Sequence, residues 1–279
     1  MTEHVVPAGV RQMPLARYLK RAYPILPGHA LRAALKGGDV KVNGARSGGD
    51  GLVSGGDRVA VDLPESRLTG ELTVLFCAGG LLAVEKPAAL PVDVDEDGIG
   101  EDTLLRRARR EHPTARLTHR LDAGTGGVMI LALTDEAERA LLGAFRVHAV
   151  GKRYQCVVRG RFPPGEVALT HYLVKHGRDS IVRAYDAPRP GALTARLTAR
   201  ALKRSDAASL VEVDLLTGRT HQIRVQLARF GHPIAGDDKY GDRAFNKARG
   251  RSMPMLWCVS LTYEDDTFTS QPPWGESDL

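Results

Sequence analysis

The first 63 residues alternate between helical and strand-like spacing of apolar side chains. Segment 14–22 has the sequence PLARYLKRA, in which apolar residues recur on one helical face behind a proline, so a short helix is expected there. A second short helix is expected over 29–38 (HALRAALKGG), with Gly37 as its stop. The sequence DVKVNG then alternates valines with polar residues before an Asn-Gly pair, which predicts a strand and a tight hairpin turn. A last strand is expected over 59–63.

From residue 72 onward, strand patterns predominate. The runs that favour strands are LTVLF, LLAVE, GGVMILAL, RYQCVVRG, ALTARLTA, SLVEVDLL and VSLTY. Two segments have helical spacing instead: TDEAERALLGAFR, with Thr134 as its capping residue, and THQIRVQLARFG, which ends at Gly231. Because the strands are joined by turns as well as by helices, we predict an α+β domain with a mixed, mostly antiparallel central sheet and flanking helices.

Charge is concentrated near the N-terminus. The chain has a formal net charge of +6. Segment 11–46 contains a series of basic residues and a single acidic residue, Asp39. A solvated charged face is the ordinary explanation, whereas a concentrated stripe also suits a polyanion such as nucleic acid. The spaced leucines and the GDVKVNG turn resemble the S4-like RNA-binding module first described in a ribosomal small-subunit protein. This resemblance implies RNA binding by four basic residues: Arg17, Arg32, Lys36 and Arg46.

Several protein classes are excluded by what the sequence lacks. No apolar run is long enough for a membrane span and no signal peptide is evident, so a cytoplasmic protein with no membrane partner is expected. The three cysteines form no C-x-x-C pair, so neither a disulfide framework nor a zinc cluster is expected.

The segment RLTHRLDAGTGGVMILALT contains the first candidate reactive group. Asp122 precedes a small-residue turn at 124–127, and an apolar strand follows at 128–133. A buried strand that anchors a tight loop is a common way to hold a reactive group still. An aspartate in such a place is also a frequent structural turn residue, so spacing alone leaves both interpretations open.

Three further sites carry polar groups suited to chemistry. Tyr154 lies on one face of a predicted strand in an otherwise apolar row, where a tyrosine more often packs in a core. Arg219 lies in the turn before a predicted helix, and His221 and Arg224 follow three residues apart on one side of it. The loop 231–241 (GHPIAGDDKYG) is rich in Gly and polar residues.

The motifs HRLDAGT, KRYQCVVRG, TGRTHQIRVQL and GHPIAGDDKYG, in this order, resemble those of the RluA-type pseudouridine synthases. The resemblance runs from about Leu72 to the C-terminus and implies the pseudouridine synthase fold. It also implies an enzyme that isomerises uridine to pseudouridine in RNA without a cofactor or metal. The expected partner is a structured RNA, ribosomal RNA being favoured over transfer RNA, and the expected state is a monomer.

The resemblance also implies roles for single residues. Asp122 matches the essential aspartate, which attacks the sugar or the ring or removes a sugar proton, and Tyr154 matches the tyrosine that packs on the base and helps to move the ring proton. Arg224 matches the basic residue that pairs with the aspartate, and Arg219 is the alternative. Arg120 matches the arginine that enters the duplex when the target nucleotide is flipped out. The expected substrate-binding residues are Arg120, Arg219, His119 and His221.

Two other functions are alternatives to pseudouridine synthesis. A non-catalytic RNA-binding protein on a synthase scaffold would keep the basic stripe and dispense with Asp122, which this chain retains. A metal-dependent hydrolase would use Asp122 with His119 and either His221 or His232, but the histidines match no known metal-site spacing.

The chain departs from the family pattern at a few positions. Gly126 stands where serine is usual, Ala88 and Asp93 stand where glycine and histidine are usual, and residues 256–258 are Leu-Trp-Cys against Leu-His-Ala. None is a proposed chemical group; each, Trp257 included, is a position at which the lining of the substrate groove can differ, so the departures bear on substrate identity more than on activity.

The expected domain organisation follows from these assignments. We predict an S4-like RNA-binding module over 1–63 and a pseudouridine synthase catalytic domain over 72–279. Segment 64–71 (PESRLTGE) is polar, contains Pro and Gly and lacks apolar periodicity, so a linker is expected between them.

Overall fold

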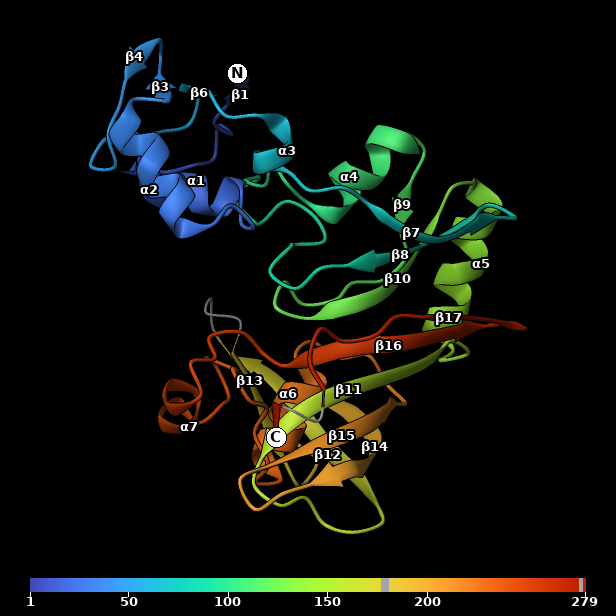
Figure 1. Cartoon of the computed structure of the whole chain (residues 1–279). Coiled ribbons are helices and arrows are strands. Elements are labelled where there is room, and N and C mark those ends of the chain that lie inside the picture. Colours follow the sequence, from blue (N-terminus) through green and yellow to red (C-terminus); the bar gives the residue numbers. More distant parts are fainter. Residues whose placement is uncertain (177–180, 276–277) are drawn as a thin grey trace. The chain divides into compact units, whose positions relative to one another are not determined.

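The computed structural model describes residues 1–176, 181–275 and 278–279, and the chain forms two compact units (Figure 1). The first unit comprises Met1–Thr73 and Ala89–Ala115, and the second comprises Val74–Ala88 and Arg116–Leu279. Each unit has its own secondary structure and is described by itself. Within the described residues, no helix combines the length and apolar character that a membrane span requires.

The first unit contains two small sheets and short helices. A four-stranded sheet has the order β1-β6-β3-β4, and β2 pairs with β5. The strands are β1 (Thr2–Val5), β2 (Met13–Pro14), β3 (Val40–Val42), β4 (Ala45–Arg46), β5 (Leu52–Val53) and β6 (Arg58–Val61), and the helices are α1 (Leu15–Ala22), α2 (Gly28–Gly37), α3 (Glu65–Leu68) and α4 (Leu104–Glu111).

Local sequence signals explain the N-terminal elements. Helix α1 begins after Pro14 and buries its apolar face, as its spacing predicted. Helix α2 extends through Gly37 and ends at Gly38, whose φ of 78° is the left-handed conformation that favours glycine, so the expected stop was one residue early. Asn43 and Gly44 both have positive φ between β3 and β4, which confirms the tight Asn-Gly hairpin turn.

Residues 89–115 belong to the first unit together with the N-terminal segment. Ile99 packs in the apolar core built by α1, α2 and β6, and Arg21 forms ion pairs with Asp95 and Asp97. Segment 64–71, expected to be a linker, includes the short helix α3, which its lack of apolar periodicity did not predict. The domain boundaries at residues 63 and 72 remain a prediction; the compact unit of the structure takes in 89–115 as well.

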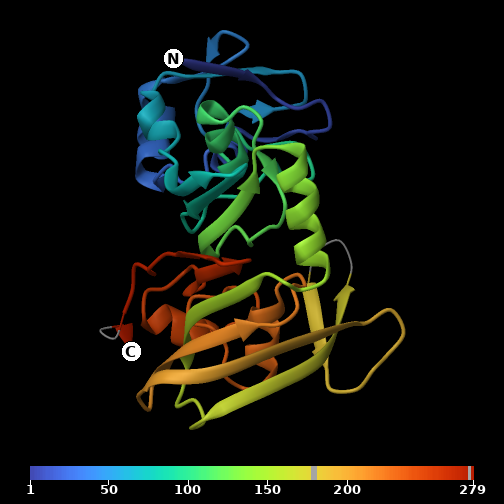
Figure 2. The same ribbon diagram turned by 90° about the vertical axis from the view of Figure 1, so that its right-hand side faces the viewer.

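The second unit is built on an 11-stranded sheet with the order β13-β12-β14-β15-β11-β16-β10-β8-β7, in which β17 also pairs with β16 and β9 with β10. The strands are β7 (Thr73–Ala78), β8 (Leu81–Lys86), β9 (Arg116–Leu117), β10 (Gly126–Ala132), β11 (Gly151–Arg159), β12 (Glu166–His176), β13 (Ile181–Tyr185), β14 (Leu193–Arg204), β15 (Ala208–Leu215), β16 (Leu256–Tyr263) and β17 (Asp266–Thr269). The helices are α5 (Asp135–Arg146), α6 (Gln222–Arg229) and α7 (Arg243–Ala248). Figure 2 shows β12, β14 and β15 as long neighbouring strands, in yellow to orange.

The pairing within this sheet confirms the predicted α+β class. Strands β10 and β16 run parallel, whereas the other recorded pairs are antiparallel, so the sheet is mixed and mostly antiparallel. The expected runs correspond to β7, β8, β10, β11, β14, β15 and β16, but the sequence pattern did not predict β12, β13 or β17. Strand β10 is buried at every position, because it lies between β8 and β16 in the interior of the sheet.

Candidate active site

The loop that carries Asp122 leads directly into β10. The carbonyl of Asp122 accepts a hydrogen bond from the backbone N–H of Thr125 at 3.0 Å, which closes the turn one residue before the strand begins. Lys86 supports the same loop, because its Nζ donates to the carbonyl of Ala123 at 3.1 Å and to that of Pro87 at 3.0 Å. The carboxylate of Asp122 is thus presented from a fixed turn, with 27% of its side chain exposed.

Lys86 itself is completely buried. Burial lowers the pKa of its ammonium group to about 7, while the negative charge of Asp122 acts in the opposite direction. A supporting role for Lys86 was not predicted from the sequence, because the loop that it contacts lies 37 positions along the chain.

Helix α6 brings Arg224 to Asp122. The Nη1 of Arg224 donates to Oδ2 of Asp122 at 3.0 Å, across 102 positions of sequence. Arg219, the alternative partner, instead donates from Nε to the carbonyl of Thr194 at 3.3 Å. Of the two candidate arginines, Arg224 is therefore the one that the fold places against the carboxylate.

A second carboxylate, Asp237, fixes the guanidinium of Arg224. Nε of Arg224 donates to Oδ2 of Asp237 at 2.7 Å and Nη2 donates to Oδ1 at 2.9 Å, a bidentate pair with a completely buried carboxylate. Asp237 also accepts the backbone N–H groups of Lys239 and Tyr240. Burial alone lowers the pKa of Arg224, but the hydrogen bonds and charge of Asp237 and the charge of Asp122 raise it overall, so the guanidinium stays charged. The loop motif GHPIAGDDKYG signalled Asp237, yet nothing in the sequence linked it to Arg224.

Tyr154 lies on β11 and is 6% exposed. It pairs with Cys258 of β16 across the sheet, and Cys258 in turn pairs with Gly127 of β10, which brings the tyrosine near the loop of Asp122. Burial raises the pKa of Tyr154 well above its ordinary value, and the neighbouring Cys258 thiol and the charge of Asp122 add to the effect. The phenol is therefore a protonated hydroxyl at neutral pH.

His221 is the first residue before α6, and its Nε2 lies 3.8 Å from Oδ2 of Asp122. Its Nδ1 lies 2.8 Å from the hydroxyl of Tyr240, which accepts a hydrogen bond from the backbone N–H of Val182 at 2.9 Å. Sequence reasoning placed His221 among the substrate-binding residues, whereas the structure places it beside the carboxylate.

The other residues expected to bind substrate have different surroundings. Arg120 is exposed, two residues before Asp122. The Nε2 of His119 accepts the backbone N–H of Ile130 at 3.0 Å, and its ring stacks on Phe145. Burial, with a smaller effect from Lys152, lowers the pKa of His119 to about 3, so this neutral ring is tied to the sheet.

The histidines of the rival metal site do not converge. Across the described residues, no group of three or more His, Cys, Asp or Glu side chains is arranged to hold a metal ion. His232 lies against the carbonyl of Arg159, at 3.1 Å from its Nδ1, and packs on Phe162 and Phe230.

Two departures from the family pattern form one packing arrangement. The indole of Trp257 lies directly against Gly126, so that a Cβ at residue 126 would fall within 2.8 Å of three ring carbons. The indole N–H donates to Oγ of Ser270 at 2.9 Å, and Trp257 is only 4% exposed. The ring of Trp257 is therefore buried and fills the space that a side chain at residue 126 would need.

In the first unit, the basic residues of the expected RNA-binding face lie on several elements. Arg17 lies on α1, Arg32 and Lys36 on α2, and Arg46 on β4. All four are exposed, and none forms an ion pair within the part of the chain that the structure describes.

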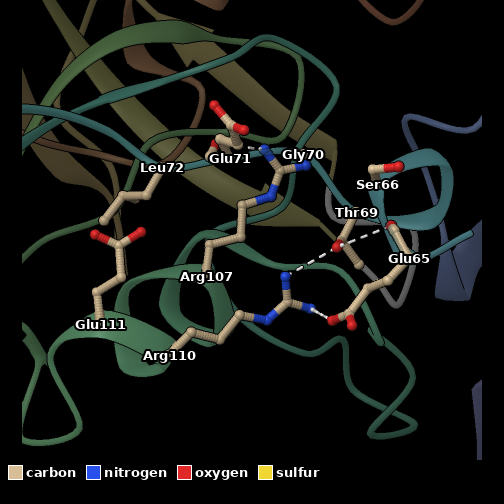
Figure 3. A pocket seen from close by; sticks show the side chains of 9 residues that line it. All are labelled: Glu65, Ser66, Thr69, Gly70, Glu71, Leu72, Arg107, Arg110 and Glu111. Atoms are coloured by element: carbon tan, nitrogen blue, oxygen red, sulfur yellow. Dashed lines mark hydrogen bonds and ion pairs between the residues drawn. The ribbon is translucent and has the colours of Figure 1, made fainter.

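The basic run 106–113 (RRARREHP) is only partly exposed. Arg107 is 4% exposed and donates from Nε and Nη2 to the carboxylate of Asp102, both at 2.7 Å. Figure 3 shows Arg110 reaching Thr69 and Glu65 at the edge of a cavity of about 310 Å³. The cavity is lined by Glu65, Ser66, Thr69, Gly70, Glu71, Leu72, Arg107, Arg110 and Glu111. Arg110 pairs with Glu65 in its lining, whereas Arg107 pairs with Asp102 outside it, and the cavity contains none of the residues gathered around Asp122.

Comparisons with known proteins show the family of the chain. The model of the RNA pseudouridylate synthase family matches residues 80–229, which leaves residues 1–79 outside the match. An uncharacterized RNA pseudouridine synthase of Mycobacterium tuberculosis (strain CDC 1551 / Oshkosh) is 33% identical over 252 residues, covering 84% of this chain and 80% of that protein. The ribosomal large subunit pseudouridine synthase C of Haemophilus influenzae (strain ATCC 51907 / DSM 11121 / KW20 / Rd) is 31% identical over 268 residues, covering 88% and 82%.

A solved structure is similar in fold. Human RNA Pseudouridylate Synthase Domain Containing 1 superposes with a TM-score of 0.64 at 24% identity, covering 75% of this chain and 86% of that chain. The chain therefore belongs to the RNA pseudouridylate synthase family: it is an RNA pseudouridine synthase with the α+β fold of that family.

Proposed function

We propose that this enzyme converts uridines of structured ribosomal RNA to pseudouridine and that Asp122 is its essential carboxylate. The observation that carries the proposal is the Asp122–Arg224–Asp237 arrangement, in which a partly exposed carboxylate is held on one oxygen by a guanidinium that a buried carboxylate fixes in place. Curated relatives named as ribosomal large subunit pseudouridine synthase C support ribosomal RNA as the substrate class.

The chemistry explains why Asp122 is held in this way. A carboxylate that attacks the substrate or removes a proton from it must be ionised and correctly aimed. The charge-assisted hydrogen bond from Arg224 at 3.0 Å serves both requirements, because it stabilises the negative charge and orients the carboxylate. Asp237 prevents the guanidinium from turning away, since it occupies Nε and Nη2 and leaves Nη1 for Asp122.

The target base must leave the RNA stack before it can react. Extrusion of a base costs a few kcal/mol, and a side chain that fills the gap lowers this cost. Arg120 is suited to this role, because it is exposed and lies two residues before Asp122. Tyr154 acts as a protonated hydroxyl beside the extruded uracil and not as a phenolate base, since its pKa is raised by burial.

The first unit supplies non-specific affinity for the RNA. Arg17, Arg32, Lys36 and Arg46 are exposed, and phosphate contacts by such residues release counterions and give salt-dependent binding. We propose that the S4-like module over 1–63 recruits the RNA to the catalytic domain over 72–279. The same proposal has the enzyme acting in the cytoplasm as a monomer.

Substitution of Asp122 by Asn tests the proposal. The purified chain is incubated with transcripts of ribosomal and transfer RNA, and pseudouridine is mapped at nucleotide resolution. We expect Asp122→Asn to abolish product while RNA affinity is retained, and Asp206→Asn, at a surface carboxylate that is 95% exposed, to leave turnover unchanged. Undiminished product from Asp122→Asn refutes the role of the carboxylate, and modification confined to transfer RNA refutes the substrate class.

A further inference from the structure

His221 has a backbone conformation that its own residue type does not favour. It has φ 55° and ψ 21°, in the left-handed region, at the residue before α6. Such a conformation is strained for a non-glycine residue and persists only where the surroundings enforce it. The side chain is 12% exposed, so the backbone strain accompanies a nearly buried imidazole beside Asp122.

The hydrogen bonds of Tyr240 favour one tautomer of His221. The backbone N–H of Val182 can only donate, so the Tyr240 oxygen accepts at 2.9 Å and its own proton is available for another acceptor. Nδ1 of His221 lies 2.8 Å away, at hydrogen-bond distance for that proton. When Nδ1 accepts it, the single ring proton of the neutral imidazole lies on Nε2.

Burial keeps the His221 ring neutral near pH 7. Burial lowers the pKa of His221, and the positive charges of Arg224 and Lys239 add to this effect. The carboxylates of Asp122 and Asp237 act in the opposite direction without overcoming the burial. The ring of Tyr240 packs edge-on against the imidazole, at 5.6 Å between centroids, which limits its rotation.

Nε2 of His221 and Nη1 of Arg224 both lie near the same atom of Asp122. Nη1 is 3.0 Å from Oδ2 and Nε2 is 3.8 Å from that same oxygen. Within the described residues, no hydrogen bond or ion pair engages Oδ1 of Asp122. Oδ2 is therefore hydrogen-bonded by Arg224 and has the His221 ring beside it, while Oδ1 has no protein partner there.

We propose that His221 is a positioning residue. Tyr240 holds its imidazole in the Nε2–H tautomer, and His221 and Arg224 together fix the position of Oδ2 of Asp122. Oδ1 is then the carboxylate oxygen that faces the target nucleotide. This inference rests on the proposed role of Asp122 as the essential carboxylate. It replaces the expected substrate-binding role of His221 with one that acts through Asp122.

The test is Tyr240→Phe, measured in single-turnover reactions with saturating RNA between pH 5.5 and 9. Phenylalanine keeps the ring but cannot donate to Nδ1, so His221 is free to change tautomer or to take up a proton beside Asp122. We expect a rate loss on the order of tenfold, consistent with loosened positioning, and a new decline of the rate toward low pH that the wild type lacks. RNA affinity should stay within about twofold, because the change is not in a group that binds RNA.

Further variants separate positioning from general structural damage. His221→Gln keeps a donor near the Nε2 position and has no titrating ring, so it should retain more activity than His221→Leu. In the Tyr240→Phe background, His221→Gln should remove the new pH dependence. Tyr185→Phe is the matched control, because Tyr185 also pairs with a histidine, His176, at 3.2 Å and on an exposed surface. It should have the wild-type rate and pH profile.

Each result has a defined meaning. A wild-type rate and pH profile for Tyr240→Phe overturns the inference, and so does a loss of RNA affinity at an unchanged rate, which assigns the pair to RNA binding. If Tyr240→Phe does not fold, equal activities of His221→Gln and His221→Leu overturn it instead. The proposed function fails separately, through an active Asp122→Asn in the same assay.

Discussion

The contact between Gly126 and Trp257 leads to a quantitative prediction about stability and activity. Gly126 does not have a positive φ, so alanine is compatible with its backbone conformation. The obstacle is the indole ring, since a Cβ would fall within 2.8 Å of three of its carbons. Gly126→Ala therefore tests packing at the base of the Asp122 loop without adding backbone strain.

The magnitude follows from the surroundings of Trp257. The ring is 4% exposed and anchored by its N–H to Ser270, so it cannot move aside freely. Forcing an extra methyl group into a packed core costs about 1–3 kcal/mol. At about 2–4 °C per kcal/mol for a domain of this size, the melting temperature should fall by several degrees. Catalysis should fall as well, because residue 126 lies four positions after Asp122.

The assay is urea unfolding followed by circular dichroism, combined with single-turnover kinetics. Gly143→Ala is the matched control: Gly143 lies in α5 with nothing within 4 Å of a built Cβ, so this change should be neutral or stabilising by up to about 1 kcal/mol. Trp257→Ala completes a double-mutant cycle. The cost of Gly126→Ala should largely disappear in the Trp257→Ala background, a coupling of roughly 1–3 kcal/mol.

Two results refute this reasoning. The first is a Gly126→Ala protein as stable and active as Gly143→Ala. The second is additivity in the cycle to within about 0.5 kcal/mol, which would show that the two residues do not share their space.

The other predictions concern Lys86 and the basic face of the first unit. Burial lowers the pKa of Lys86 to about 7, whereas a lysine in the unfolded chain has a pKa near 10.4. Between about pH 7 and 10 the unfolded chain therefore binds one more proton than the folded chain. The free energy of unfolding should rise with pH over this range, by up to about 1.4 kcal/mol per pH unit. Unfolding measured at several pH values should show a smaller slope in Lys86→Met. The control Lys247→Met, at an exposed position, should keep the slope. Equal slopes in both variants would contradict the lowered pKa of Lys86. Replacing both Arg32 and Lys36 by Ala should weaken RNA binding and reduce the slope of log affinity against log salt by about 1.4–1.8, if each contacts one phosphate. An unchanged slope would show that the RNA does not cross α2.

Several elements could be predicted because their signals are local. Helix α5 begins where expected, since the hydroxyl of Thr134 accepts the backbone N–H of Ala137 at 3.2 Å and apolar residues follow at helical spacing. The tight turn at Asn43 and Gly44 is equally local, because both residues tolerate positive φ. Strands β12 and β13 were not predicted, because their apolar and polar residues form no strong alternating pattern. Their stability depends on pairing of β12 with β14 and of β12 with β13.

The sequence by itself determined the family and the candidate residues for the chemistry: Asp122, Tyr154 and Arg224 lie in motifs that can be read along the chain. Only the tertiary structure decided how they are joined. It selected Arg224 over Arg219, recruited Asp237 to fix the guanidinium, and turned His221 toward the carboxylate. The physical reason is that hydrogen bonds and van der Waals contacts act over a few ångströms in space, and the partners in this site come from segments as many as 102 positions apart.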